Sequence, residues 1–208
     1  MRCAVLANDV MKEELLSKKI SSTVELIIVD SLDELFSVEA DVFFDLEFLF
    51  DKERINQLTQ LLPKPVFINS VVHTLQEIDR PFIRVNAWPT FLKRNVCEIA
   101  INENQTSSVK EIFEKMAWHY QIVPDVEGMV SARIIAMIIN EAYYTLDDEV
   151  STKTEIDIAM KLGTHYPLGP FEWCEKIGLK NIYELLLQLS KTESRYTIAK
   201  SLEKEINH

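Results

Sequence analysis

The sequence predicts two structural domains, an α/β domain with a mainly parallel sheet followed by an all-helical domain. In the first half, short β-rich runs alternate with helical patterns, which implies crossover connections and a parallel sheet. After about residue 105 the hydrophobic periodicity is helical throughout. The expected domains are therefore residues 1–105 and 106–208.

The α/β half contains six expected strands, with helices between the first four. The strands are rich in Val, Ile and Phe and are bounded by polar or turn residues, as buried strands are. We expect strands at residues 2–7, 24–29, 41–46, 65–68, 82–85 and 97–101. We expect helices at residues 10–19, 32–36 and 51–62.

Capping patterns mark helix starts in the second half. Ser108-Val109-Lys110-Glu111 matches a capping box and predicts a helix to about residue 119. A long helix is expected at 127–146, and its segment 129–139 is apolar on nearly every side, so neighbours must bury it. Thr152-Lys153-Thr154-Glu155 is a second capping box, and Gly163 is placed to end that helix in a left-handed turn. Shorter helices are expected at 170–177, 181–188 and 193–205.

Composition excludes several classes of partner. The 208 residues carry a net charge of -11, which repels a phosphate backbone and an anionic membrane surface. The start of the chain has no signal-peptide pattern, and its most apolar stretch, 134–139, is far shorter than the roughly 20 residues that span a bilayer. The cysteines Cys3, Cys97 and Cys174 lie far apart, which suits a reducing compartment. We expect a cytoplasmic protein that binds neither nucleic acid nor membrane.

Five short motifs between residues 127 and 172 follow one another in a specific order and spacing. They are Glu127-Gly128-Met129-Val130-Ser131-Ala132-Arg133, Asn140-Glu141-Ala142, Glu155-Ile156-Asp157, Ala159-Met160-Lys161-Leu162-Gly163 and Tyr166-Pro167-Leu168-Gly169-Pro170-Phe171-Glu172. Here the chain resembles the C-terminal domain of the NAD-dependent 3-hydroxyacyl-CoA dehydrogenases. The resemblance implies a degenerate Rossmann-like dinucleotide-binding domain in the first half and an all-helical C-terminal domain of that family's type. It also implies a homodimer, because family members pair through the helical domain.

The turn after the first expected strand lacks the glycines that hold a dinucleotide. The Gly-x-Gly-x-x-Gly sequence needs glycine for a tight turn, for close approach of the pyrophosphate and for helix packing. The chain has four glycines, all in the second half: Gly128, Gly163, Gly169 and Gly178. The resemblance aligns the three glycine positions with Ala7, Asp9 and Lys12, and Asp9 places a carboxylate where the pyrophosphate would lie. We expect no cofactor, with NAD as the cofactor if the site functions.

Two other positions relate to the cofactor and the substrate. Asp30 aligns with an acidic residue that binds the ribose hydroxyls, and the alternative is an ordinary strand-end aspartate that turns into the next helix. Asn69 falls within the family's Ser-Asn-Thr-Ser segment. Only about ten residues separate Asp30 from Asp41, where the family has a helical hairpin that contributes to the acyl-CoA site. This hairpin is expected to be absent.

The catalytic residues of the family are only partly present. The family uses a His backed by a Glu as the base for the hydroxyl proton, with Ser and Asn holding the thioester substrate. These four positions align with Asn86, Glu98, Val71 and Ala132. The Asn86 amide cannot accept a proton at neutral pH, and Glu98 alone could be a satisfied polar residue at a strand end. Asn86 and Glu98 are therefore expected to be remnants of an inactive catalytic pair.

Three functional hypotheses follow. The first is a pseudoenzyme, a dimeric binding or regulatory module with acyl-CoA as its candidate ligand. The second is an active NAD-dependent 3-hydroxyacyl-CoA dehydrogenase of fatty-acid metabolism with atypical cofactor binding. The third is a subunit that docks on another protein through its helical domain. Neither the histidines nor the cysteines show ligand spacing, so no metal site is expected.

Overall fold

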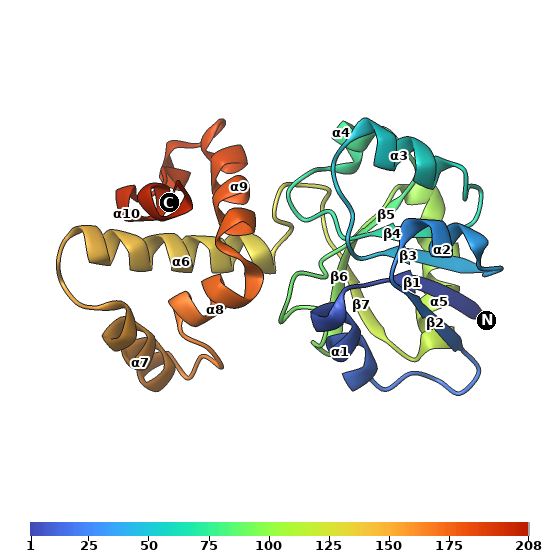
Figure 1. The fold of residues 1–208 in the computed structure, drawn as a ribbon, viewed down its shortest axis with the longest axis horizontal. Coiled ribbons are helices and arrows are strands. Elements are labelled where there is room, and N and C mark those ends of the chain that lie inside the picture. The colour runs from blue at the N-terminus through green and yellow to red at the C-terminus, as the bar shows by residue number, and fades with distance from the viewer. Residues whose placement is uncertain (208) are drawn as a thin grey trace. The chain divides into compact units, whose positions relative to one another are not determined.

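The structure is a computed structural model that describes residues 1–207, and the chain divides into two compact units. The first unit is Met1–Met129 and the second begins at Val130. Figure 1 shows that the strands all belong to the first unit, whereas the described part of the second unit is helical. The α/β domain followed by an all-helical domain is therefore confirmed.

The first unit is a seven-stranded sheet in the order β2-β1-β3-β4-β5-β6-β7. Neighbouring strands are parallel except β5 and β6, which are antiparallel. The strands are β1 (Arg2–Leu6), β2 (Glu25–Val29), β3 (Val42–Asp45), β4 (Val66–Ile68), β5 (Ile83–Val85), β6 (Val96–Ala100) and β7 (His119–Ile122). The first six lie where the sequence predicts them.

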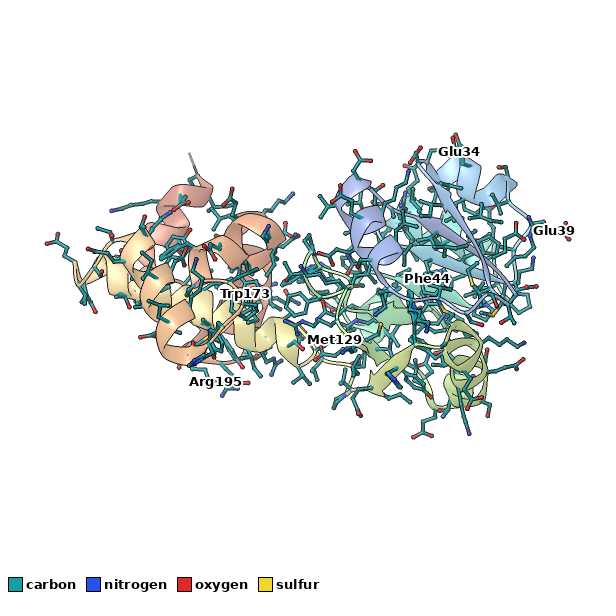
Figure 2. The ribbon with its side chains drawn as sticks, turned by 90° about the horizontal axis from the view of Figure 1, so that it is seen from below. Glu34, Glu39, Phe44, Met129, Trp173 and Arg195 are labelled. Atoms are coloured by element: carbon teal, nitrogen blue, oxygen red, sulfur yellow. The ribbon has the colours of Figure 1, made fainter. Side chains whose placement is uncertain are left out.

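Helices cover both faces of this sheet. On one face α1 (Asp9–Ser17) and α5 (Thr106–Met116) pack on the strands, with Leu15, Phe44 and Phe113 in one apolar core. On the other face lie α2 (Leu32–Ser37), α3 (Lys52–Thr59) and α4 (Leu75–Ile78). Figure 2 shows Phe44 inside this unit among the side chains of the core. Between β2 and β3 the chain forms only α2, so the family's helical hairpin is absent from residues 30–41.

The first unit extends beyond the expected boundary at residue 105. Ala117 takes a left-handed conformation (φ 58°) after α5, and β7 then pairs in parallel with β6. The strand β7 was not predicted, because the helix expected from Ser108 runs to residue 119 and four residues at a sheet edge are too short a pattern to identify a strand. Beyond β7, Asp125 accepts a 2.5 Å hydrogen bond from the fully buried guanidinium of Arg84. These contacts place the boundary after Met129.

The second unit consists of helices packed around α6. They are α6 (Ser131–Asp147), α7 (Lys153–Thr164), α8 (Pro170–Ile177), α9 (Leu179–Ser190), a 3-10 turn at Ser194–Tyr196 and α10 (Lys200–Ile206). The long helix begins at Ser131, so residues 127–130 precede it, and the helix expected at 193–205 is two separate elements. Figure 2 shows Trp173 among these helices.

Three expected helix ends can be compared with the structure. The Thr152–Glu155 capping box is confirmed, since Glu155 N–H donates to Thr152 Oγ1 (3.3 Å) and Thr152 N–H donates to Glu155 Oε2 (3.2 Å). The capping box at Ser108 was a wrong prediction, because α5 already begins at Thr106 after a 3-10 turn. Gly163 does not end α7 either: the helix continues to Thr164, and His165 takes the left-handed conformation (φ 56°).

The turn into α8 is held by a buried carboxylate. Asp157 on α7 accepts hydrogen bonds from Phe171 N–H (2.8 Å) and Glu172 N–H (3.2 Å), two of the free donors at the start of α8. A Cβ atom at Gly169 would lie 2.2 Å from Asp157 Oδ1, so this position requires glycine. Phe171 is buried, in agreement with the prediction that it points into the core.

Candidate functional site

The turn from β1 into α1 is closed by its own side chains. Asn8 caps α1, and its Oδ1 accepts a hydrogen bond from Met11 N–H (3.1 Å). Asp9 adds an exposed carboxylate in the first turn of the helix, and Ala7 is buried. None of residues 7–12 has a positive φ, so the backbone does not form the glycine-dependent turn of a dinucleotide site. An anion at this helix end would face a carboxylate and a donor that is already occupied.

Asp30 lies directly after β2 and is exposed. Its backbone N–H donates to Glu34 Oε2 (3.0 Å), and the neighbouring Ser31 caps α2 through Glu34 N–H (3.2 Å). The Asp30 backbone therefore takes part in the turn that starts α2, while its carboxylate is exposed. The sheet order places it four strands from β5, or about 19 Å at the usual strand spacing.

Asn69 connects three loops at the carboxyl ends of the parallel strands. Its Nδ2 donates to the Leu46 carbonyl (3.1 Å) after β3, and its Oδ1 accepts from Ala87 N–H (3.0 Å) after β5. Its own N–H donates to the Asp45 carbonyl (2.9 Å). Both ends of the side-chain amide thus hold the backbone of neighbouring loops.

Asn86 and Glu98 lie side by side on antiparallel strands. Asn86 N–H donates to the Glu98 carbonyl (3.0 Å), and Asn86 Nδ2 donates to Glu98 Oε2 (3.3 Å). Asn86 is only 3% exposed, and no described residue offers its buried Oδ1 a hydrogen bond. An amide in this place orients the carboxylate but has no lone pair basic enough to remove a proton.

The segment after Asn86 is strained. Thr90 has φ 78°, which a β-branched residue rarely adopts, and its buried Oγ1 finds no partner among residues 1–207. Glu14 on α1 holds the same segment by accepting from Thr90 N–H (2.5 Å) and Lys93 N–H (3.3 Å). Backbone strain of this kind gathers at functional sites. The sequence analysis did not identify Glu14 or Thr90, since the partners are 76 residues apart along the chain.

The positively charged side chain of Arg94 interacts electrostatically with Glu98. Burial lowers the pKa of the Arg94 guanidinium, while the charges of Glu98 and Glu14 act in the opposite direction. The guanidinium also lies over the Phe91 ring, 3.9 Å from its centroid. Two carboxylates and an aromatic ring therefore interact favourably with the Arg94 guanidinium.

Comparison with known proteins identifies the relatives of this chain. The profile of the 3-hydroxyacyl-CoA dehydrogenase C-terminal domain matches residues 128–208. A 3-hydroxybutyryl-CoA dehydrogenase of Bradyrhizobium diazoefficiens is 28% identical over 210 residues, which cover 92% of this chain and 69% of that protein. Residues 128–208 belong to the 3-hydroxyacyl-CoA dehydrogenase C-terminal domain family. A 3-hydroxyadipyl-CoA dehydrogenase of Escherichia coli is 43% identical over 76 residues, but these cover only 16% of that longer protein.

Solved structures share the fold of this chain. The (S)-3-hydroxybutyryl-CoA dehydrogenase PaaH1 of Ralstonia eutropha superposes with a TM-score of 0.69 at 20% identity, over 88% of this chain and 70% of that one. FadB2 of M. tuberculosis superposes with a TM-score of 0.75 at 12% identity, over 99% of this chain and 93% of that one. The two-unit architecture is thus that of a solved 3-hydroxybutyryl-CoA dehydrogenase.

The residues present do not fit a dinucleotide bound in the manner of the glycine-rich turn. Asn8 occupies a donor of α1, and Asp9 carries the same sign of charge as a pyrophosphate. The pair that the structure does bring together, Asn86 with Glu98, lies where the family's base and its supporting carboxylate align. Of the other two aligned positions, Val71 and Ala132 are buried and apolar, so neither side chain can hold a thioester oxygen.

Within residues 1–207, no group of three His, Cys, Asp or Glu side chains is arranged to hold a metal ion. None of the helices in this part of the chain combines the length and the apolar character that crossing a bilayer requires.

Proposed function

We propose that this 3-hydroxyacyl-CoA dehydrogenase relative is a binding or regulatory module that does not transfer hydride. The observation that supports this most directly is the β1–α1 turn, in which Asn8 and Asp9 occupy the helix end that would receive a pyrophosphate. Asn86 supports it independently, because an amide stands where a general base would be needed. The candidate ligand is an acyl-CoA, by analogy with the thioester substrates that the relatives' names indicate.

The alternative is an active oxidoreductase with atypical cofactor binding. The hydrogen bond between Asn86 and Glu98 favours it, since this contact keeps a carboxylate beside the aligned base position. The strained Thr90 in the following segment also favours it. This alternative requires NADH to bind and to be consumed with a 3-oxoacyl thioester.

Isothermal titration with NADH and then with acetoacetyl-CoA tests the proposal, with absorbance at the nicotinamide band followed on the same sample. We expect no NADH binding at millimolar concentration and no loss of absorbance. The matched variant carries Ala7→Gly, Asp9→Gly and Lys12→Gly, which restores the three glycines. NADH binding by this variant but not by the natural chain would assign the loss to the turn. NADH consumption by the natural chain would overturn the proposal in favour of the active enzyme.

A homodimer formed through the helical unit completes the proposal. Six large apolar side chains are at least 43% exposed within this unit: Val130, Ile134, Val150, Ile158, Leu162 and Leu187. Ile158 and Leu162 are one turn apart on α7, so they form one apolar strip on the helix. Exposed strips of this kind mark contact surfaces. A different protein docking on the same face is the competing explanation.

A further inference from the structure

A cavity of about 330 Å³ lies within the second unit. Its lining comes from α6, α7, α8, α9 and α10: Tyr143, Lys153, Asp157, Phe171, Glu172, Cys174, Glu175, Leu179 and Glu205. All of these residues belong to the helical unit, whereas Asn86 and Glu98 belong to the first unit. Its volume falls in the range of small-molecule sites.

A cation already lies in this cavity. The Lys153 ammonium is 5.1 Å from the centroid of the Tyr143 ring and 5.2 Å from that of Phe171. The two rings meet edge to face, 5.0 Å apart at 72°. Glu205 Oε2 lies 2.5 Å from the same ammonium. Two ring faces and one carboxylate are the elements with which proteins bind organic ammonium groups.

The walls of the cavity carry an excess of negative charge. Four carboxylates line it, on Asp157, Glu172, Glu175 and Glu205, whereas Lys153 is the single cationic residue of the lining. Asp157 is engaged by the N–H groups of α8, and Glu172 pairs with Lys161 at the rim. Glu175 and Glu205 therefore leave the surroundings of Lys153 negative, which favours a cationic occupant over an anionic one.

Lys153 can leave its position. It is the first residue of α7, its side chain is 44% exposed, and its stem has four flexible bonds. An external ammonium could then take the place between the rings without any change in the helices. The Lys153 ammonium therefore competes with an external ammonium for the position beside the two rings.

We propose that this cavity binds a small organic cation of the alkylammonium class, whose charged head replaces the Lys153 ammonium between Tyr143 and Phe171 beside Glu205. The proposal does not depend on whether the first unit transfers hydride. It predicts that removing the lysine strengthens binding, which a purely structural ion pair would not do.

Isothermal titration of the full chain with choline tests this, with the uncharged isostere 3,3-dimethyl-1-butanol as the matched ligand control. We expect saturable binding of choline and none of the alcohol. Lys153→Met should tighten choline binding about tenfold, because the competing ammonium is removed, and Glu205→Gln should weaken it about tenfold, because one ionic contact is lost.

Three outcomes would overturn the proposal: equal binding of the alcohol, loss of choline binding in Lys153→Met, or no saturable binding by any variant. Thermal unfolding of each variant establishes that it is folded. Lys153→Gln provides a second variant without the ammonium, so that a folding defect of one variant does not decide the result.

Discussion

At the residue scale, the packing of the helical unit depends on glycine at position 169. Its position leaves no room for a side chain beside Asp157, whose carboxylate holds the first N–H groups of α8. Gly163, six residues earlier, lies within α7 and has nothing within 4 Å of a Cβ atom. The glycines of two neighbouring motifs therefore differ: only Gly169 requires the absence of a side chain.

We expect Gly169→Ala to destabilise the helical unit by about 2–4 kcal/mol, because the added Cβ displaces a buried carboxylate from its hydrogen bonds. Gly163→Ala should instead stabilise it by about 0.5–1 kcal/mol, since alanine favours the interior of a helix. Urea unfolding of both variants gives the two values. A destabilising Gly163→Ala would show that this glycine ends the helix after all.

At the scale of secondary-structure elements, the two capping patterns of the sequence differ in their position: one lies at a helix start and the other inside a helix. Thr152 precedes α7 and makes both hydrogen bonds of the box, whereas Ser108 lies inside α5. We expect Thr152→Ala to lower the free energy of unfolding by about 1 kcal/mol, because a side-chain acceptor for Glu155 N–H is lost. Ser108→Ala is the matched control and should change it by less than about 0.5 kcal/mol. Chemical denaturation followed by circular dichroism separates the two.

The elements also show what the sequence can and cannot predict. Six strands follow from apolar runs bounded by turn residues, and α8 begins at Pro170 as expected, because these signals are local. The strand β7 could not be predicted from such patterns, since His119 and Gln121 on one side and Ile122 on the other are all exposed.

The candidate site also contains one contact that could be expected from the sequence and others that could not. The contact between Asn86 and Glu98 follows from the family resemblance and is present. The roles of Asn69 and Glu14 depend on backbone groups that other strands and loops bring to them. No spacing within either segment encodes such partners, because they are set only when the sheet forms.

At the scale of the whole molecule, the exposed apolar side chains of α7 bear on assembly. We expect Leu162→Glu to convert a dimer into a monomer, because a carboxylate cannot be buried unpaired in an apolar contact. Leu16→Glu, at an exposed leucine of α1 in the first unit, is the matched control and should leave the dimer intact. Analytical ultracentrifugation measures both. A natural chain that is monomeric would favour a different protein as the partner of this face.

The buried thiols give the chain a defined response to alkaline pH. Burial raises the pKa of Cys3 and of Cys174 from 9.0 to about 11. A folded pKa above the unfolded value means that the folded state holds more protons, so its stability is complete below pH 9 and decreases as the pH rises towards 11. Each thiol contributes a loss on the order of 2 kcal/mol across this window.

Denaturant unfolding at pH 8 and at pH 10.5 measures this decrease. Cys3 belongs to the first unit and Cys174 to the second, so each substitution reports on its own unit. We expect Cys3→Ala and Cys174→Ala each to reduce the pH dependence. A dependence that neither substitution changes would assign it to other groups, such as Tyr143, whose pKa burial also raises.

The buried Arg84 has a consequence for how the chain folds as it is synthesised. Its guanidinium donates to the carbonyls of Ser70 and Val71, and the carboxylate that accepts a hydrogen bond from it, Asp125, follows 41 residues later. At the usual rate of translation, Asp125 is made about 2 to 8 seconds after Arg84. During that interval β5 carries a cation that costs several kcal/mol to bury without a counter-charge. We therefore expect β5 to pack stably in the sheet only after residue 125 has left the ribosome, and a chain that ends at residue 105 to lack the hydrogen bond that holds Arg84.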